Sequence, residues 1–252
     1  MCSKWLPGLF LSLFFLASCS VKEDRRTCPC RLALDFDGLC VTPVMLDVRG
    51  EEGYAHAQAV FSDTLLVLDV PRGRVSVAAA GGAVPDGEGS VRIPAGEEAP
   101  PLYLFQAGVD AAEDRLDLPV RLRKQFCLLE LLFSGPPGYG PPFAVEVEGD
   151  YDGWLRDGTP LKGPFSRRLL PDGDGRALLR LPRQGDDTLR MHIVFSDRVV
   201  RTFSLGSYIA ASGYDWTAPD LEDLTLQVDI SLTSLTLSTD LWSMTEDIEL
   251  WI

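Results

Sequence analysis

The feature that most constrains the fold of this chain is a hydrophobic period of two residues, which recurs along most of its length. Leu32, Leu34 and Phe36 alternate with polar or small residues, and the same alternation returns over residues 44–48 and 75–79. A period of two places alternate side chains on opposite faces of a strand, whereas an amphipathic helix needs a period of 3.6 residues. The chain is therefore predicted to fold as a series of half-buried strands.

These strands are short, and glycine- and proline-rich turns separate them. About fourteen such strands without a long helical period predict an all-β architecture of packed sandwiches. The chain is long enough for one large or two small domains. We divide it into an N-terminal sandwich over residues 28–115 and a C-terminal sandwich over residues 116–252. Only the acidic, alanine-containing stretch over residues 110–114 favours a short helix.

The clearest strand lies near the C-terminus. Its alternating apolar positions are Leu224, Leu226, Val228, Ile230 and Leu232. The alternation then changes parity at residues 233–234 and continues to residue 237. A β-bulge or a corner between two sheets would produce such a slip.

The N-terminal residues have the pattern of a bacterial lipoprotein signal. Lys4 precedes an apolar run over residues 5–17, which is shorter than the ~20 residues of a membrane-spanning helix. Residues 16–19, Leu-Ala-Ser-Cys, match the lipobox: an aliphatic residue and two small residues before a cysteine. The alternative is an ordinary secretory signal that happens to place a cysteine there.

The lipobox predicts a signal peptide over residues 1–18 and a lipidated tether over residues 19–27, with the acyl chains on Cys19. Residues 20–26, with the sequence SVKEDRR, resemble the lysine-plus-acidic signal that directs some lipoproteins to the cell surface. We therefore expect a lipid-anchored, surface-exposed protein of the outer membrane. The inner face of the outer membrane is the competing location, because a solvated linker is also charged.

The net charge of −14 argues against nucleic acid and bare anionic lipid as partners, since both would repel the chain. Four cysteines follow the lipobox. Cys28 and Cys30 are too close in sequence for a comfortable mutual bridge, so an expected disulfide would join one of them to Cys40. The alternative is that Cys30 and Cys127 are small buried residues on strands.

Motifs for catalysis are absent from the sequence. His56 and His192 stand apart, and no Gly-x-Ser-x-Gly elbow or phosphate-binding glycine loop occurs. Aspartates in residues 150–157 and 172–175 resemble fragments of a calcium loop, but the closing bidentate glutamate is missing after residue 174, and Asp-Gly pairs are common in turns. We expect no catalytic residue, no metal site and no cofactor.

Aromatic residues suggest a second class of function. Trp154 and Trp216 lie in turn-rich segments, where they could form a platform for a sugar ring. Trp242 and Trp251 lie in the terminal strand region, where core packing is the commoner role.

Three segments carry a resemblance to a known family. The opening Cys19-Ser-Val-Lys-Glu-Asp-Arg-Arg-Thr-Cys28-Pro-Cys30, which leads into the strand at residues 32–36, resembles FimB-type fimbrial anchor lipoproteins of type V pili in the fimbrillin superfamily. The turn and strand over residues 70–77, Val-Pro-Arg-Gly-Arg-Val-Ser-Val, and the ending over residues 247–251 are similar to that family too. The resemblance extends over most of the chain as a pattern rather than as an invariant signature.

The resemblance implies two tandem transthyretin-like β-sandwich domains and a non-enzymatic protein at the base of a fimbria. Its implied partners are fimbrial stalk or accessory subunits, bound by β-strand pairing. The segment with Leu224, Leu226, Val228, Ile230 and Leu232 is the candidate for strand exchange, and the alternative is that it is simply a strand of its own sandwich. The competing functions are a surface glycan-binding lipoprotein and a carboxylate-based hydrolase.

Overall fold

The structure is a computed structural model of the 252-residue chain, and it describes residues 28–83, 89–135, 143–196, 198–229, 234–238 and 243–247. The strands of the N-terminal half are β1 (Cys30–Asp35), β2 (Val44–Gly50), β3 (Ala55–Val60), β4 (Leu65–Val70), β5 (Arg74–Gly81), β6 (Ser90–Arg92), β7 (Tyr103–Asp110), β8 (Arg115–Pro119) and β9 (Arg123–Lys124). Those of the C-terminal half are β10 (Phe126–Ser134), β11 (Ala144–Leu155), β12 (Pro160–Leu169), β13 (Arg176–Pro182), β14 (Arg190–Phe195), β15 (Arg198–Phe203), β16 (Leu224–Asp229), β17 (Ser234–Ser238) and β18 (Ser243–Asp247). A 3₁₀ turn, Glu51–Gly53, follows β2, and one α-helix, α1 (Leu205–Ala211), follows β15.

The expected all-β sandwich architecture is confirmed. In the N-terminal sandwich, a sheet of order β4-β1-β8 packs on a sheet of order β3-β2-β5-β7-β9. Alternating residues of β1 face inward, so Leu32, Leu34 and Phe36 are fully buried in one core with Val44 and Val77 of the second sheet. The period of two thus places the apolar side chains of each sheet on the face that packs against the other sheet.

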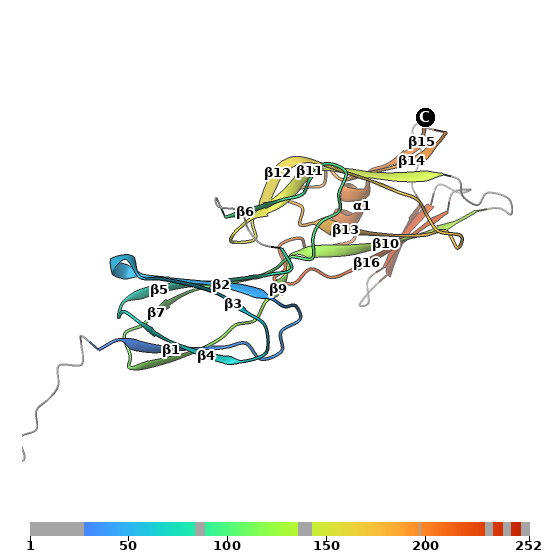
Figure 1. Ribbon diagram of the computed structural model, residues 1–252. Helices are drawn as coiled ribbons and strands as arrows, with labels where there is room; N and C mark the ends of the chain where they lie inside the picture. The colour runs from blue at the N-terminus through green and yellow to red at the C-terminus, as the bar shows by residue number, and fades with distance from the viewer. Residues whose placement is uncertain are drawn as a thin grey trace, which may run out of the picture.

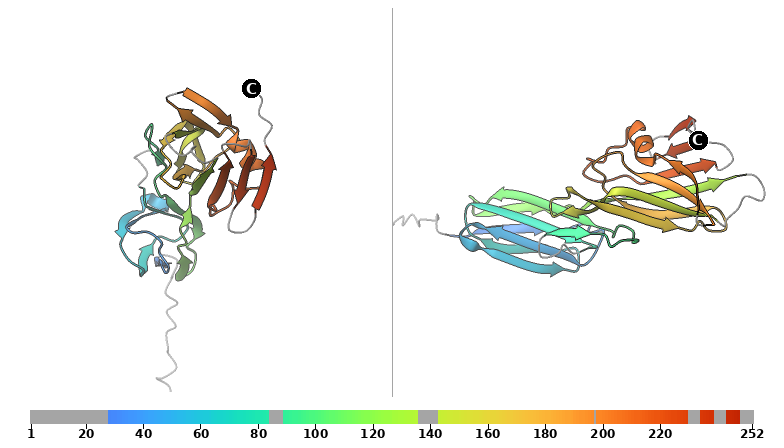
Figure 2. Two further views of the ribbon diagram at one scale, coloured as in Figure 1. Left: turned by 90° about the vertical axis from the view of Figure 1, so that its right-hand side faces the viewer. Right: turned by 90° about the horizontal axis from the view of Figure 1, so that it is seen from above.

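The C-terminal sandwich has the same plan. A sheet of order β13-β10-β16-β17-β18 lies opposite a sheet of order β12-β11-β14-β15. The core between them includes Leu129, Leu131, Val147, Met191 and Leu226, all with exposed fractions of 0%. Helix α1 contacts β14 beside this core. Figures 1 and 2 show the two sandwiches lying end to end, so the molecule is elongated.

The chain passes between the sandwiches three times. It leaves β5 to form β6, which pairs antiparallel with β11 and places Val91 opposite Trp154, and it then returns to β7. The third crossing is the direct step from β9, which pairs with β7, into β10. The N-terminal core takes in Leu116, Leu118 and Leu122, so the expected boundary at residue 115 falls inside that core. The reason is the parallel pairing of β8 with β1, a contact between segments distant in sequence.

Two local expectations were wrong. Residues 110–114 form no helix: Asp110 ends β7, and Ala111 is fully buried with its N–H bonded to the carbonyl of Gly73 at 2.8 Å. The parity slip near residue 233 marks a hairpin rather than a bulge, because β17 pairs antiparallel with β16 and Val228 lies opposite Leu235. Tertiary pairing decides both segments.

Candidate functional site

The predicted strand-exchange segment lies within its own sheet. Leu224, Leu226 and Val228 are buried on β16, which pairs in parallel with β10 and antiparallel with β17. Both edges of β16 are therefore occupied. Ile230, Leu232 and the lipidation residue Cys19 lie outside the described residues.

The cysteines that the structure describes are free thiols. Cys28 and Cys40 are exposed, whereas Cys30 and Cys127 are buried. Cys30 begins β1 and Cys40 follows its far end, and a six-residue strand spans roughly 17 Å, against the 4.4–6.8 Å between Cα atoms that a disulfide needs. The expected bridge from Cys28 or Cys30 to Cys40 is therefore not formed. Burial raises the pKa of the Cys127 thiol to about 12, as expected of an inert core residue.

The two tryptophans predicted as a sugar platform differ in burial. Trp154 is fully buried, and its Nε1 donates to the backbone carbonyl of Gln125 at 2.9 Å, so it forms no sugar platform. Trp216 is partly buried and packs edge-on against Tyr214, with 4.8 Å between the ring centroids. Trp242 and Trp251 lie outside the described residues.

The histidines and aspartate turns have local structural partners. His56 Nε2 lies 3.1 Å from Gln58 Oε1, and His192 Nδ1 lies 2.8 Å from Thr202 Oγ1 on the next strand. Asp172 Oδ1 accepts the N–H groups of Asp174 and Arg176, which closes a turn. In the part of the chain that the structure describes, no His, Cys, Asp and Glu side chains gather as a metal site, and no helix has the length and hydropathy of a membrane span.

A cleft with a volume of about 730 Å³ lies at the junction of the two sandwiches. Its walls come from β7, the β8–β10 segment, the β11–β12 turn and the loops after β13 and α1. Four arginines line it: Arg121, Arg123, Arg156 and Arg183. Trp216 contributes an aromatic wall. Aspartates pair with three of these arginines: Asp35 with Arg121, Asp220 with Arg123 and Asp47 with Arg156.

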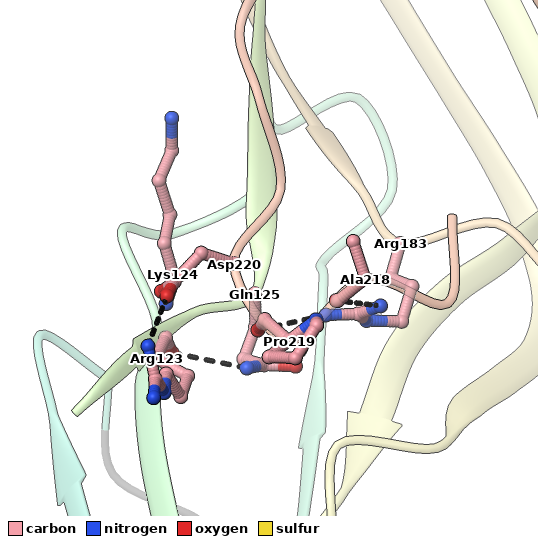
Figure 3. A network of polar contacts seen from close by, with 7 residues as sticks. All are labelled: Arg123, Lys124, Gln125, Arg183, Ala218, Pro219 and Asp220. Carbon is pink, nitrogen blue, oxygen red and sulfur yellow. Dashed lines mark hydrogen bonds and ion pairs between the residues drawn. The ribbon is translucent and has the colours of Figure 1, made fainter. Parts of the chain in front are cut away.

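Arg183 holds one wall of the cleft in place (Figure 3). Only 7% of this residue is exposed, and its Nη1 donates to the carbonyls of Trp216 and Ala218, the latter at 2.9 Å. Its Nη2 donates to Gln125 Oε1 at 3.1 Å. Burial lowers the pKa of Arg183, although the nearby Tyr214 and acidic groups oppose that shift. The guanidinium fixes the loop that follows α1 to the start of β10.

Ion pairs across the junction fix one sandwich to the other. Arg123 Nη1 lies 2.7 Å from Asp220 Oδ2 (Figure 3). Lys124 pairs with Asp223 as well, so β9 of the N-terminal sandwich is bound to the loop before β16. Asp220 Oδ1 also accepts the backbone N–H of Lys124 at 2.9 Å.

A further pair connects Arg156, in the β11–β12 turn, with Asp47 on β2. Burial opposes ionisation of Asp47, but hydrogen bonds from Arg49 and Arg156 outweigh that effect and hold the pKa of Asp47 below its usual value. The junction therefore combines three covalent crossings with several charge-assisted bonds, which favours a fixed angle between the sandwiches.

The cleft is suited to binding rather than to hydrolysis. Among its described lining residues Asp157 is the single carboxylate, whereas glycoside hydrolysis uses a pair of them. The arginines, the amides of Gln125 and Gln184, and the indole of Trp216 are groups that bind anions and sugar hydroxyls. The sequence analysis did not predict this site, because its lining comes from five separate segments.

Solved structures share this fold. The fimbrial anchor protein Mfa2 from Porphyromonas gingivalis is 13% identical with a TM-score of 0.56, and the match covers 86% of this chain and 99% of that one. Candidate polysaccharide-binding proteins from Bacteroides thetaiotaomicron are 14% identical with a TM-score of 0.63, over 87% and 98% of the two chains. A candidate adhesin from Bacteroides ovatus is 14% identical with a TM-score of 0.61, over 86% and 95%.

At these identities the likeness establishes the fold. No protein-family profile and no curated protein matches the sequence.

Proposed function

We propose that this chain is a non-enzymatic outer-membrane lipoprotein that anchors fimbriae of the type V pilus to the cell surface and limits their length. Cleavage after Ser18 would leave acyl chains on Cys19, and residues 19–27 would be the tether. The lipobox supports the lipid anchor. The fold shared with a fimbrial anchor protein over nearly the whole of both chains supports the fimbrial role.

The observation that carries this proposal is the layout of the two sandwiches. Strand β1 begins at the end of the N-terminal sandwich that lies farthest from the C-terminal one (Figure 1). Near that end, Arg72 Nε donates to the carbonyl of Cys28 at 2.9 Å, which ties the start of the described chain to the β4–β5 turn. A membrane attached through Cys19 would thus lie at one pole, and the C-terminal sandwich would project away from it.

A fixed junction suits this role, because a fimbria pulls on its anchor. The ion pairs of Asp47, Asp220 and Asp223 and the β6 crossing connect the two sandwiches at several points. The partner in this proposal is a fimbrial stalk or accessory subunit that adds a strand to a sheet edge.

The test is a strain that carries Cys19→Ala at the native locus, compared with a strain that carries Ser20→Ala beside an intact lipobox. Electron microscopy of cells and medium should find fimbriae shed into the medium, and overlong, only in the Cys19→Ala strain. Fimbriae retained equally by both strains would contradict anchoring by this chain.

Trp216 in the junction cleft favours a second candidate function, namely binding of a surface glycan. An indole face stacks on sugar rings, and the exposed parts of Arg121, Arg123 and Arg156 would donate to an acidic sugar beside their aspartate partners. A glycan array probed with the purified chain and with Trp216→Ala tests this candidate. Binding of acidic glycans by the wild type that the variant loses would support it, and a blank array would exclude those glycans.

A further inference from the structure

Strand β4 is an edge strand with an unusual surface. Of the described residues, only those of β1 pair with it, so alternate residues of β4 direct their N–H and C=O groups outward. Its outward-facing Leu65 and Val67 are 55% and 51% exposed, and Phe61 just before the strand is 71% exposed. Unpaired backbone groups beside apolar side chains are the surface that a strand from another chain can extend.

Other described edges carry residues that discourage such pairing. Proline cannot donate to a ladder, and charged side chains resist burial against a neighbouring strand. These residues are Pro119 on β8, Pro160 and Lys162 on β12, Arg176 on β13, Arg198 on β15, Arg92 on β6, Arg123 and Lys124 on β9, and Glu246 and Asp247 on β18. β3 has no such residue, but its exposed alanines offer little apolar surface. β4 contains no proline, and its one charged residue, Asp69, lies near the end of the strand, away from the exposed Leu65 and Val67.

The neighbouring strand indicates what would pair with β4. On the outer face of the sheet, Val67 lies beside Ala33, and Asp69 lies beside Arg31. A strand added to the free edge of β4 would extend these rows of neighbouring side chains. It would place apolar residues beside Leu65 and Val67 and a basic residue beside Asp69. Asp63, in the turn before β4, gives the other end of the strand an acidic flank as well.

We propose that the free edge of β4 binds an extended strand of a fimbrial subunit, in which apolar residues alternate and basic residues flank them. The fimbrial identity of the partner rests on the proposed function, whereas the strand docking itself does not. The site differs from the β16 segment, whose two edges are already paired.

The test uses the purified mature chain in detergent and a fluorescent synthetic peptide, in which valines alternate with threonines and a lysine closes each end. Val67→Lys places a charge on the free edge and should weaken peptide binding at least tenfold. Leu178→Lys on the β13 edge is the matched control, since Leu178 is 46% exposed, and should change binding less than twofold. Equal thermal midpoints of the two variants would show that both are folded.

Two further measurements sharpen the result. Amide hydrogen exchange of β4 should slow when the peptide is added, and a peptide with glutamates in place of the lysines should bind several-fold more weakly. Loss of binding in both lysine variants, or in neither, would overturn the docking site whatever the Cys19→Ala strain shows. If Val67→Lys weakens the peptide but cells carrying it retain their fimbriae, the fimbrial identity of the partner is overturned.

Discussion

Arg183 hydrogen-bonds to Trp216, which follows it by 33 residues in the sequence. Its guanidinium donates to two backbone carbonyls of the loop after α1 and to Gln125. The amide of Gln125 in turn donates to the carbonyl of Arg123 at 3.0 Å. A buried acceptor that loses its hydrogen-bond donor lowers the stability of the fold by roughly 1–3 kcal/mol. The side chain of Arg183 is therefore expected to stabilise the loop that forms this wall of the cleft.

Replacing Arg183 with methionine should therefore destabilise the C-terminal sandwich by about 2 kcal/mol and speed hydrogen exchange in residues 214–220. Methionine keeps much of the length but donates no hydrogen bond. Arg115→Met is the control, because Arg115 forms an exposed ion pair with Asp117 and its loss should leave stability nearly unchanged. Urea unfolding and exchange measured by mass spectrometry check both, and equal effects of the two variants would contradict the role of Arg183.

Asp47 makes the junction sensitive to acid. Its pKa in the folded chain is depressed by Arg49 and Arg156. The ion pairs of the Asp47 carboxylate therefore stabilise the folded chain fully above the pKa of an unfolded aspartate, about 3.9. This stabilisation is lost as the pH falls through the lower pKa that Asp47 has in the folded chain.

The urea midpoint of Asp47→Asn should accordingly lie below that of the wild type at pH 7, and the gap should narrow as the pH falls below about 4. Asp117→Asn, which removes an exposed pair, should leave the midpoint nearly unchanged at both pH values. A gap for Asp47→Asn that stayed constant down to pH 2 would argue against the ion pair as its source.

At the scale of elements, β6 shows how close the two sandwiches come. Gly153 on β11 lies opposite Arg92, and a Cβ at Gly153 would stand 2.1 Å from the carbonyl oxygen of Val91. The short crossing strand can pair with β11 only because this position has no side chain.

Gly153→Ala should therefore displace β6 and destabilise the C-terminal sandwich by about 1–3 kcal/mol. Gly108→Ala on β7 is the matched control, since a Cβ there meets no atom within 4 Å, and it should be neutral or slightly stabilising. Urea unfolding of the two variants decides between them, and equal stability would show that β6 is not held against β11.

The alternation of apolar residues was enough to predict the strands, because a half-buried strand needs one apolar face. Leu32, Leu34 and Phe36 are buried as that pattern requires. Pairing partners were not predictable in the same way. The parallel contact of β8 with β1 and the β6 crossing join segments far apart in sequence, and no local pattern records them.

The candidate site was harder to predict for the same reason. Trp154 sits in a turn-rich sequence but packs fully in the core, since β6 covers it. Trp216 has a similar sequence context and lines the cleft. The four arginines are spread over 63 positions and are indistinguishable in sequence from ordinary surface residues. Only the junction brings them together.

At the scale of the whole molecule, the chain is a two-sandwich rod with the start of β1 at one end (Figures 1 and 2). The net charge of −14 keeps such a rod away from anionic surfaces, so its attachment would depend on the acyl chains of Cys19 and its tether. Under the proposed function, the lipidated end of the chain would lie in the membrane and the rest of the chain would sit at the base of a fimbria.

The most direct test of that account is immunogold electron microscopy of fimbriae released from wild-type cells in two ways. Detergent dissolves the membrane and should release fimbriae that carry gold against this chain at one end only. Mechanical shear breaks the shaft and should release fimbriae without gold, because the anchor stays on the cell. Gold along the shaft, or at the distal tip of fimbriae still attached to cells, would contradict the account.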